Sequence, residues 1–455
     1  MTIQAIRESE FGREGAAAPT STALFTDHYE LTALDAALRS GVAEHRAVFE
    51  VFTRRLPHGR RYGVVAGMGR AIEAVERFRF TEAELEFLAE REVLSRAGLD
   101  YLADFRFSGE IAGYRDGELF FPHSPILTVE APFGEALLLE TVLLSILNFD
   151  SAVASAAARM VSVARGRTMI EAGSRRTHEH AAVAAALAAF IAGFDVTSNL
   201  EAGRRYGIPT AGTTMHAFTL AHRSEIEAFR AQVERFGADT TFLVDTYDIP
   251  QGIRNAVDAA GPGIKAIRID SGDLEIEAGK ARLLLDELGA VDCDVVVSSD
   301  LDEFAIELLH DDPVDKYMVG TRLVTGSGAP TAGLVYKLVG IADEPGDDAP
   351  IRPVAKASEG KGHRGGRKRA TRLLRNGVAV AELVETPDQH ETVPDGLTAR
   401  PLQVTWIRDG EVVERLAPID ARNHHRAAIG ELPPEALDIA PGDTFLHGAL
   451  GLPAF

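Results

Sequence analysis

Residues 266–274 read Ala-Ile-Arg-Ile-Asp-Ser-Gly-Asp-Leu, which predicts a buried strand that ends in a polar turn. Side chains alternate along a strand, so Arg268 and Asp270 lie on the same side of it. A charged pair at the end of an apolar strand is costly unless something is bound there, and ligands bind at the carboxyl ends of strands in α/β proteins. A cation beside an anion suits a ligand of mixed charge, such as a phosphorylated sugar with bound Mg²⁺.

The same pattern, an apolar strand that leads through a turn into a helix, extends on both sides of this stretch, from about residue 168 to residue 322. Strands are expected at 168–171, 241–247, 264–270, 294–299 and 316–321, with helices between them at about 180–192, 223–236, 250–259, 274–288 and 301–310. Such alternation is typical of a parallel sheet or barrel. Polar or glycine-rich turns end four of these strands, at 245–248, 270–273, 298–300 and 320–322. In a parallel barrel these ends meet on one face, where the active site belongs.

The flanking segments mix helices with short strands. Helical patterns precede residue 168 at about 30–41, 69–78, 81–92, 134–147 and 151–165, and Thr81 with Glu84 three residues later forms a capping-box signature. Proline-interrupted extended runs occupy about 108–130, and a linker rich in Pro, Asp and Gly at about 342–350 leads to a C-terminal lobe of short strands. Residues 1–20 are expected to form a disordered tail.

Composition limits the class of protein. The chain has 455 residues, a net charge of −21 and 45% apolar residues, as in an ordinary soluble protein with room for two cores. The acidic balance disfavours binding to nucleic acid or to a membrane, and no uninterrupted apolar stretch approaches the ~20 residues that span a bilayer. A lone cysteine, Cys293, fits a reducing cytoplasm and makes a zinc site improbable.

One segment departs from the acidic average. Nine Lys or Arg residues fall between Arg352 and Arg375, against Glu359 alone. The segment is either a solvated basic loop or an anion-binding flap, because its glycines would let backbone N–H groups approach a phosphate. An RNA-binding tail is less favoured, since no aromatic residues alternate with the basic ones.

Several further residues are candidates for chemistry, each with an ordinary structural alternative. His216 follows a Gly/Thr-rich connection, so it is either a surface histidine or a base or phosphate-accepting nucleophile. Arg175 is solvated, or it holds a carboxylate. The turn Gly320-Thr321 is a common turn, or it wraps N–H groups around a phosphate. Tyr29, near the start of a helix, could stack on an aromatic ligand.

Taken together, these motifs resemble the nicotinate phosphoribosyltransferase family, which has the type II phosphoribosyltransferase fold. The matching stretches occur in the family's order over roughly residues 24 to 376, and the ordered set is more specific than any one of them. They are Phe25-Thr26-Asp27-His28-Tyr29-Glu30-Leu31-Thr32, Phe49-Glu50-Val51-Phe52-Thr53-Arg54, Glu171-Ala172-Gly173-Ser174-Arg175-Arg176, Thr197-Ser198-Asn199, Gly212-Thr213-Thr214-Met215-His216, Val244-Asp245-Thr246-Tyr247-Asp248, Ile269-Asp270-Ser271-Gly272-Asp273-Leu274, Val319-Gly320-Thr321-Arg322-Leu323-Val324-Thr325-Gly326 and Val335-Tyr336-Lys337-Leu338-Val339.

The resemblance implies an irregular parallel α/β barrel packed on an N-terminal α/β domain that later segments complete. With the sequence texture, it places the N-terminal domain at 21–130, the barrel at 131–330 and a C-terminal segment, including the basic flap 352–375, at 331–455. It also implies a homodimer. The implied reaction converts nicotinate, phosphoribosyl pyrophosphate, ATP and water to nicotinate mononucleotide, pyrophosphate, ADP and phosphate, the first step of NAD salvage from nicotinate.

The resemblance also implies the site residues. His216 matches the histidine that ATP phosphorylates, and Asp270 and Asp300 are the other expected catalytic residues, with Asp270 a candidate ligand of Mg²⁺. The expected substrate-binding residues are Tyr29, Arg175, Ser198, Asp245, Arg268, Gly320 and Thr321. The expected ATP contacts in the flap are Lys356, Lys361, Arg367 and Lys368.

Two alternatives remain at this point. The chain could use nicotinamide or quinolinate instead of nicotinate, although Arg175-Arg176 and Thr197-Ser198-Asn199 favour the singly acidic substrate. It could also be a catalytically silent metabolite-binding protein of the same fold, which the presence of His216, Asp270 and Asp300 disfavours.

Overall fold

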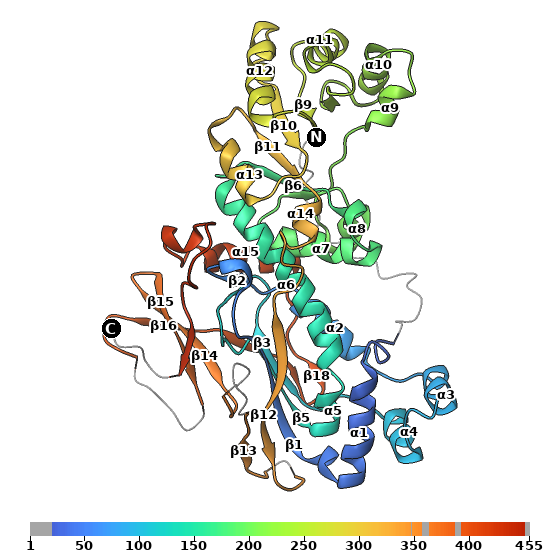
Figure 1. Ribbon diagram of the computed structural model, residues 1–455, viewed down its shortest axis with the longest axis vertical. Coiled ribbons are helices and arrows are strands. Elements are labelled where there is room, and N and C mark those ends of the chain that lie inside the picture. The colour runs from blue at the N-terminus through green and yellow to red at the C-terminus, as the bar shows by residue number, and fades with distance from the viewer. Residues whose placement is uncertain (1–20, 347, 357–363, 387–392, 451–455) are drawn as a thin grey trace. The chain divides into compact units, whose positions relative to one another are not determined.

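The computed structural model describes residues 21–346, 348–356, 364–386 and 393–450 (Figure 1). The expected tail at 1–20 and the expected ATP contact Lys361 lie outside these residues. The described chain divides into two compact units. Residues 156–328 form one, here called the parallel unit, and residues 21–155 with 329–450 form the other, the antiparallel unit.

The parallel unit contains a six-stranded sheet in the order β7-β6-β11-β10-β9-β8. The strands are β6 (Thr168–Glu171), β7 (Val196–Thr197), β8 (Thr241–Leu243), β9 (Ala266–Ile269), β10 (Asp294–Ser298) and β11 (Lys316–Val319). All neighbouring strands are parallel, so their carboxyl ends share one edge. In the described structure β7 and β8 are the two edge strands, so this parallel sheet stays open and forms a half-barrel. The predicted α/β class is confirmed.

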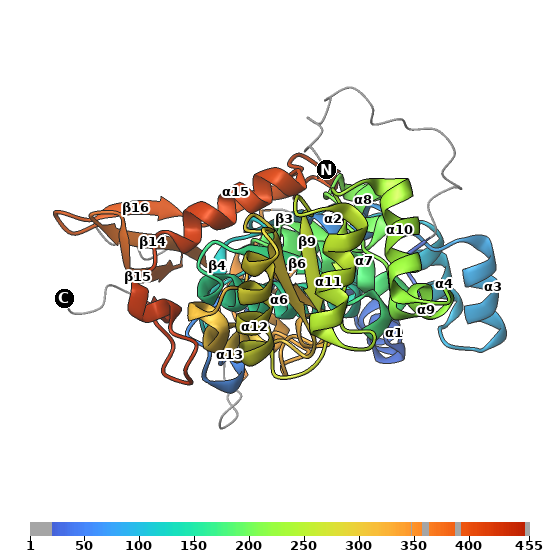
Figure 2. The same cartoon turned by 90° about the horizontal axis from the view of Figure 1, so that it is seen from above.

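Helices connect the strands as the alternating pattern predicts. They are α7 (Glu179–Ile191), α8 (Leu200–Tyr206), α9 (His216–Leu220), α10 (Glu225–Phe236), α11 (Ile249–Ala260), α12 (Leu274–Glu287), α13 (Glu303–Leu308) and α14 (Thr321–Val324). Figure 2 shows α10, α11 and α12 following one another beside the sheet. Acidic residues of the strand-end turns cap three of them, because Asp248, Asp273 and Asp302 each accept a hydrogen bond from a first-turn N–H.

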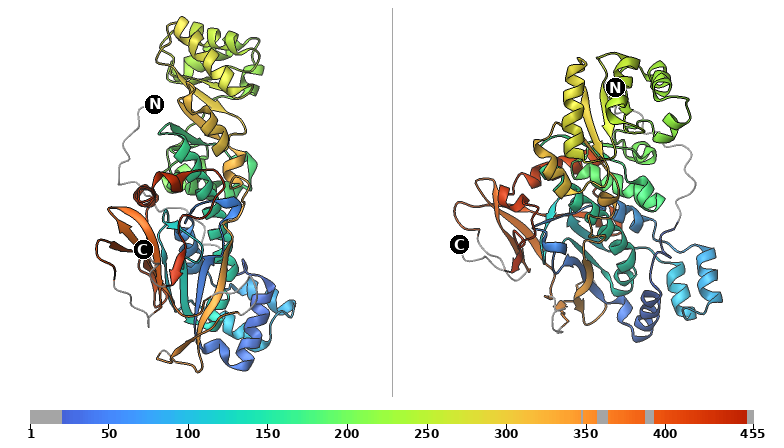
Figure 3. Two further views of the ribbon diagram at one scale, coloured as in Figure 1. Left: turned by 60° about the vertical axis from the view of Figure 1, so that its left-hand side comes forward. Right: turned by 45° about the horizontal axis from the view of Figure 1, so that its top comes forward.

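The antiparallel unit is organised around a seven-stranded sheet in the order β13-β12-β1-β5-β3-β17-β18. Its strands are β1 (Arg46–Thr53), β3 (Glu110–Tyr114), β5 (Leu127–Pro132), β12 (Leu334–Ala342), β13 (Ile351–Pro353), β17 (Gln403–Arg408) and β18 (Glu411–Val412). β1 pairs with β5 on one side and with β12 on the other, visible as blue beside orange in Figure 3. Strands from the last third of the chain therefore complete a sheet that the first third begins.

Smaller elements surround this sheet. The other strands are β2 (Gly63–Val64), which pairs with β4 (Leu119–Phe120), and the four-stranded sheet β16-β14-β15-β19, with β14 (Arg369–Arg375), β15 (Val378–Glu385), β16 (Thr398–Pro401) and β19 (Gly448–Leu450). The helices are α1 (His28–Ser40), α2 (Met68–Glu76), α3 (Glu82–Glu90), α4 (Arg96–Ala103), α5 (Phe133–Leu137) and α15 (Pro418–Ile429). The capping box at Thr81 and Glu84 is present in α3, as predicted.

The prediction of separate helices at 134–147 and 151–165 is wrong. After the short helix α5, a single helix, α6 (Glu140–Val163), runs through the expected break. The polar residues there do not interrupt the helix because they bond to neighbouring elements. Asn148 pairs with both backbone groups of Leu334, and Asp150 binds the guanidinium of Arg70 at 2.7 Å.

The segment Phe133–Val163 is long and apolar enough to cross a membrane by length and composition alone. Of its most apolar window, 61% is buried within the structure. Asp150, 1% exposed and paired with Arg70, lies within the same segment. A partly buried apolar helix with an internal ion pair is typical of a protein core, so we interpret α6 as a core helix.

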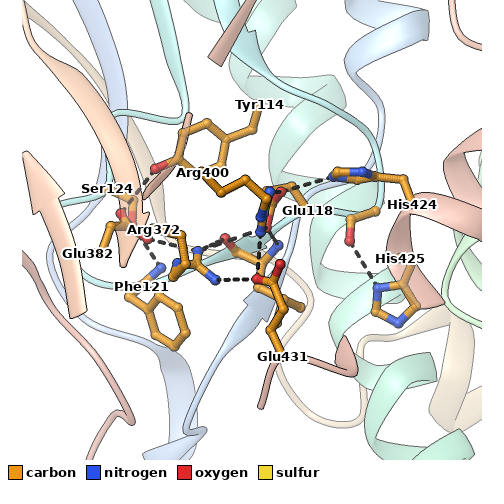
Figure 4. A network of polar contacts seen from close by, with 12 residues as sticks. Tyr114, Glu118, Phe121, Ser124, Arg372, Glu382, Arg400, His424, His425 and Glu431 are labelled. Atoms are coloured by element: carbon orange, nitrogen blue, oxygen red, sulfur yellow. Dashed lines mark hydrogen bonds and ion pairs between the residues drawn. The ribbon is translucent and has the colours of Figure 1, made fainter. Parts of the chain in front are cut away.

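A cluster of polar side chains, which we call the buried network, links three strands of the four-stranded sheet to β4 and to the end of α15 (Figure 4). Arg372, fully buried, binds Glu382 at 2.9 Å and lies over the ring of Phe121. Arg400 holds Glu118 with two nitrogens and Glu431 with one. The remaining members are Tyr114 and Ser124, which donate to Glu382, and His424, which bonds to Glu118.

Electrostatics in the buried network favour the charged form of Glu118. Burial alone would raise the pKa of Glu118, but hydrogen bonds from His424 and Arg400 hold that pKa far below its ordinary value. The network joins β4 to β14, β15, β16 and the end of α15, so it ties the C-terminal strands to the N-terminal half of the antiparallel unit.

Candidate active site

The carboxyl ends of the parallel strands surround a pocket of about 240 Å³. Three arginines and two aspartates line it, together with small residues of the strand-end turns. Its lining residues are Ala172, Arg175, Arg176, Arg268, Asp270, Ser298, Ser299, Asp300, Met318, Gly320 and Thr321. Six of the ten sequence-predicted catalytic and substrate-binding residues thus meet at one edge, namely Arg175, Arg268, Asp270, Asp300, Gly320 and Thr321.

Arg268, near the end of β9, and Asp270, directly after it, form an ion pair at 2.9 Å. Ser298, at the end of the adjacent strand β10, bonds to both of them, accepting from the Nε of Arg268 at 2.8 Å and donating to Asp270. Burial would raise the pKa of Asp270, but the Ser298 hydroxyl and the Arg268 charge outweigh it and hold that pKa below its ordinary value. Asp270 is therefore a carboxylate at neutral pH.

His216 begins α9 and faces two carboxylates. Its Nε2 lies 3.9 Å from Asp270 and 4.0 Å from Asp245, while its Nδ1 shares a hydrogen bond with the Thr246 hydroxyl at 3.1 Å. Two hydrogen bonds hold the Asp245 carboxylate, since one of its oxygens accepts from the Asp270 N–H and from the Ser271 hydroxyl. Its other oxygen is buried without a hydrogen bond in the described structure, and this is the oxygen closest to His216. We call Arg268, Asp270, Asp245 and His216 the strand-end cluster.

The turn after β11 brings Gly320 and Thr321 to the pocket. A Cβ at Gly320 would make an ordinary van der Waals contact with the Ala172 carbonyl oxygen, at 3.4 Å, so packing alone does not demand glycine there. On the neighbouring turn Ser299 has a φ of 152°, an unusual value for a residue with a side chain. Such backbone strain concentrates at functional sites, and here it lies immediately before Asp300.

Arg175 and Ser198 lie in two adjacent loops, after β6 and β7. Arg175 is exposed at the pocket and has no hydrogen bond or ion pair to any described residue. A free guanidinium can take a carboxylate with two parallel hydrogen bonds. Ser198 donates its backbone N–H to the Glu171 carbonyl at 2.8 Å but is not part of the pocket lining.

Tyr29 belongs to the antiparallel unit, in the first turn of α1. Its side chain is half-exposed. Burial, assisted by the charges of Glu140 and Glu30, raises the pKa of its hydroxyl to about 12. The phenol therefore stays neutral at physiological pH, and its exposed ring remains suitable for stacking on an aromatic ligand.

The described residues of the basic segment also belong to the antiparallel unit. Lys368 is buried and paired with Glu50 at 2.9 Å, and Arg367 binds Glu110 at 2.7 Å and Glu130 at 2.9 Å. Lys356 is exposed after β13. Two of the expected flap residues therefore already have carboxylate partners, and an ATP contact from any of them stays a prediction.

Comparison with known proteins identifies the family. A nicotinate phosphoribosyltransferase of Mycobacterium tuberculosis is 52% identical over 92% of this chain and 93% of its own length. The chain belongs to the nicotinate phosphoribosyltransferase family. Residues 24–148 match the family model of the nicotinate phosphoribosyltransferase N-terminal domain. The nicotinate phosphoribosyltransferase of Bacillus subtilis is 41% identical over 71% of this chain and 68% of its own.

A solved structure agrees with this assignment. The crystal structure of human nicotinic acid phosphoribosyltransferase matches with a TM-score of 0.77 and 25% identity, covering 92% of this chain and 97% of that one. The family resemblance inferred from the ordered motifs is thus confirmed, and so is the fold class that it implied.

Several residues of this nicotinate phosphoribosyltransferase site could not be predicted from the sequence. Ser298, Thr246 and Thr213 all bond to members of the strand-end cluster, Thr213 through the Arg268 guanidinium at 3.4 Å. Each occurs in a polar stretch that was singled out, but hydroxyl residues are too common in turns to be selected individually. Glu171 was also missed, although an acidic residue at the end of a buried strand is the kind of signal that revealed Asp270.

Proposed function

We propose that this chain catalyses the transfer of a phosphoribosyl group to nicotinate, giving nicotinate mononucleotide and pyrophosphate for NAD synthesis. The observation that carries the proposal is the pocket itself, where Arg175, the Arg268–Asp270 pair and the Gly320-Thr321 turn meet at one sheet edge. Membership in the family supports the same reaction.

The pocket residues divide the work of binding and transfer. Arg175 takes the nicotinate carboxylate, and the Gly320-Thr321 turn takes the 5′-phosphate through its N–H groups. The pyridine nitrogen then forms a bond to the anomeric carbon as the bond from that carbon to pyrophosphate breaks. Positive charge develops on the ribose, and the ionised Asp270 beside it lowers the barrier electrostatically.

The residues present fit a magnesium-dependent reaction. Among the described residues, no group of three or more His, Cys, Asp or Glu side chains is arranged to hold a metal alone. Mg²⁺ needs only one or two protein carboxylates when a substrate supplies phosphate oxygens. Asp270 and Asp300 would hold it, and the ion would neutralise charge on the departing pyrophosphate.

We further propose that ATP phosphorylates His216 during turnover. The carboxylates of Asp245 and Asp270 face Nε2 and favour a proton there. Nδ1 then keeps its lone pair, which attacks the γ-phosphorus of ATP as the bond to the bridging oxygen breaks and ADP leaves. Water later takes the phosphoryl group and releases phosphate. The phosphorylated ring adds negative charge next to the donor site and changes donor affinity.

A substrate panel tests the transfer reaction. The purified chain is given phosphoribosyl pyrophosphate and Mg²⁺ with nicotinate, nicotinamide or quinolinate, each with and without ATP, and released pyrophosphate is measured. We expect turnover with nicotinate and stimulation by ATP. Turnover only with nicotinamide or quinolinate, or with none of the three, would refute the proposal.

A labelling experiment tests the phosphohistidine. Incubation with γ-labelled ATP should give an acid-labile, base-stable label that His216→Ala abolishes. His222→Ala is the matched control, because His222 lies shortly after the same helix, α9, and the Nδ1 of its ring bonds to the Phe218 carbonyl rather than to a residue of the pocket. Labelling that persists in His216→Ala would exclude the role.

We also propose that the chain is a homodimer. Phe25 and Tyr29, before and within the first turn of α1, are 66% and 52% exposed, which supports a protein partner at this point. Light scattering coupled to gel filtration should give twice the mass of 48.9 kDa. A monomer at micromolar concentration would refute the assembly without affecting the reaction.

A further inference from the structure

We propose that Glu171, Thr197 and Asn199 form a positioning chain that fixes the loop carrying Arg175, and so sets the preference for an acidic pyridine over its amide. The inference rests on the proposed function, in which Arg175 takes the nicotinate carboxylate. None of the three residues lines the pocket. They act on it through Ser174 and Gly173, the two residues that precede Arg175.

The positioning chain consists of four consecutive hydrogen bonds within the parallel unit. Glu171, at the end of β6, accepts from the Gly173 N–H with one oxygen and from the Thr197 hydroxyl with the other. The Thr197 oxygen accepts from the Asn199 N–H at 3.0 Å. The Asn199 side chain then donates to the Ser174 hydroxyl at 2.9 Å.

Burial makes the hydrogen bonds of the positioning chain hard to replace. Glu171 and Thr197 are each 1% exposed, so neither finds water in place of its partner. Both donors to Glu171 require an acceptor, and a buried carboxylate satisfied by two donors is rigid. Burial raises the pKa of Glu171, although the Thr197 and Gly173 bonds oppose the rise.

The same loop also packs closely against the proposed phosphate turn. A Cβ at Gly173 would lie 2.2 Å from a Val324 methyl group, and the Ala172 N–H donates to the Val319 carbonyl at 2.8 Å. Val319 and Val324 flank Gly320 and Thr321. The loop of Arg175 is therefore held on one side by the turn that takes the phosphate and on the other by the positioning chain.

This arrangement separates the two binding tasks. The close approach of Gly173 to Val324 does not involve the Thr197 hydroxyl itself, whereas the hydrogen bonds that lead to Ser174 pass through it. Loss of the positioning chain should free Arg175 without disturbing Gly320 and Thr321. Affinity for the pyridine carboxylate should then fall while affinity for the phosphoribosyl donor is kept.

The principal test is Thr197→Val, which keeps the shape of the side chain and removes both hydrogen bonds of its hydroxyl. We expect the Michaelis constant for nicotinate to rise about tenfold, as for loss of a buried hydrogen bond. The constant for the donor should stay within about twofold, and the nicotinate-over-nicotinamide ratio of kcat/KM should fall. Thr197→Ser, which retains the hydroxyl, should restore wild-type values.

A second variant keeps the test decisive if Thr197→Val does not fold. Ser174→Ala removes only the far end of the chain and should raise the nicotinate constant about threefold. Thr177→Val is the matched control, because Thr177 lies in the same loop and its hydroxyl bonds to no described residue. It should leave both constants unchanged.

The outcomes separate this inference from the proposed function. If Arg175→Ala raises the nicotinate constant but Thr197→Val and Ser174→Ala do not, the positioning chain is refuted and the carboxylate assignment stands. Equal effects of Thr197→Val on both constants, or failure of Thr197→Ser to restore them, would also overturn it. If Arg175→Ala has no effect on nicotinate, the carboxylate assignment itself fails.

Discussion

Two clusters in this molecule combine arginine and carboxylate side chains, the buried network and the strand-end cluster, and they differ in which carboxylate oxygens are left unpaired. In the buried network, both oxygens of Glu382 and both of Glu118 accept hydrogen bonds from protein groups. In the strand-end cluster, Asp270 is a third exposed and a buried oxygen of Asp245 has no hydrogen bond in the described structure. The carboxylates are therefore fully hydrogen-bonded in the buried network and only partly so in the strand-end cluster, although the Nε and Nη1 of Arg372 and the Nε of Arg400 also lack a hydrogen bond in the described structure.

The balance of positive and negative side chains also differs between the pocket and the buried network. The pocket carries three arginines against two aspartates, and Arg175 has no partner among the described residues. A phosphorylated, pyrophosphate-bearing substrate can complete this set of charges. Arg372 and Arg400 each have a carboxylate partner within the protein already.

The largest expected effect is on stability, from Arg372→Met. Removing one partner leaves Glu382 as an uncompensated buried charge, which costs about 3–5 kcal/mol of unfolding free energy. Chemical denaturation should show this loss, while kcat/KM per folded molecule stays near wild type. Arg372→Lys, which keeps the charge, should cost less. A loss below about 1 kcal/mol for Arg372→Met would mean that the buried network is not a stabilising element.

The complementary change, Asp270→Asn, should act on activity. It removes the charge beside the developing ribosyl cation, so kcat/KM should fall about 10²–10³-fold. Asp270 is a third exposed, and an amide can still accept from Ser298 and Arg268. The free energy of unfolding should therefore change by less than about 1 kcal/mol. A destabilised but active Asp270→Asn would contradict the contrast between the two clusters.

The next prediction concerns acid stability near the buried network. His425 is buried beside it, shares a hydrogen bond with the Gly117 carbonyl, and burial lowers its pKa to about 4. As pH falls below about 6.5, the unfolded chain takes up a proton that the native state refuses, so stability falls by up to about 1.4 kcal/mol per pH unit until pH 4. Glu118 does not contribute above about pH 5, because a carboxyl with a lowered pKa loses its stabilisation only as pH falls through its ordinary pKa of 4.5 and below, so the two effects overlap only at the acid end of this window.

The variant His425→Asn isolates this term, since an amide can still donate to the Gly117 carbonyl. Unfolding free energies of both proteins are measured from pH 8 to about pH 4. The difference between them should be constant above about pH 6.5 and should change in favour of the variant below it. A difference that does not vary with pH would show that His425 titrates normally.

These contrasts explain which features the sequence could predict. Arg268, Asp270, Asp300, Gly320 and Thr321 were predictable because each lies at or just after the carboxyl end of a strand, and parallel strands bring these ends together without further information.

The buried network was not predictable in this way. Arg400 and Glu118 are 282 residues apart, and no local pattern pairs them. The continuity of α6 was missed for the same reason. Asn148 and Asp150 suggest a helix break until their partners, Leu334 and Arg70, are known.

The smallest expected effect sets the scale for the others. Arg96 and Asp100 form an ion pair in α4 at 2.9 Å, with 87% and 59% of their side chains exposed. Water and salt screen such a pair, so Arg96→Gln should change the free energy of unfolding by less than about 1 kcal/mol and leave turnover unchanged. Denaturation at low and high salt measures it. If Arg96→Gln cost as much unfolding free energy as Arg372→Met, burial would not explain why one ion pair stabilises the protein more than another. The difference in stability between variants of the buried network and of the strand-end cluster would then have a cause other than burial.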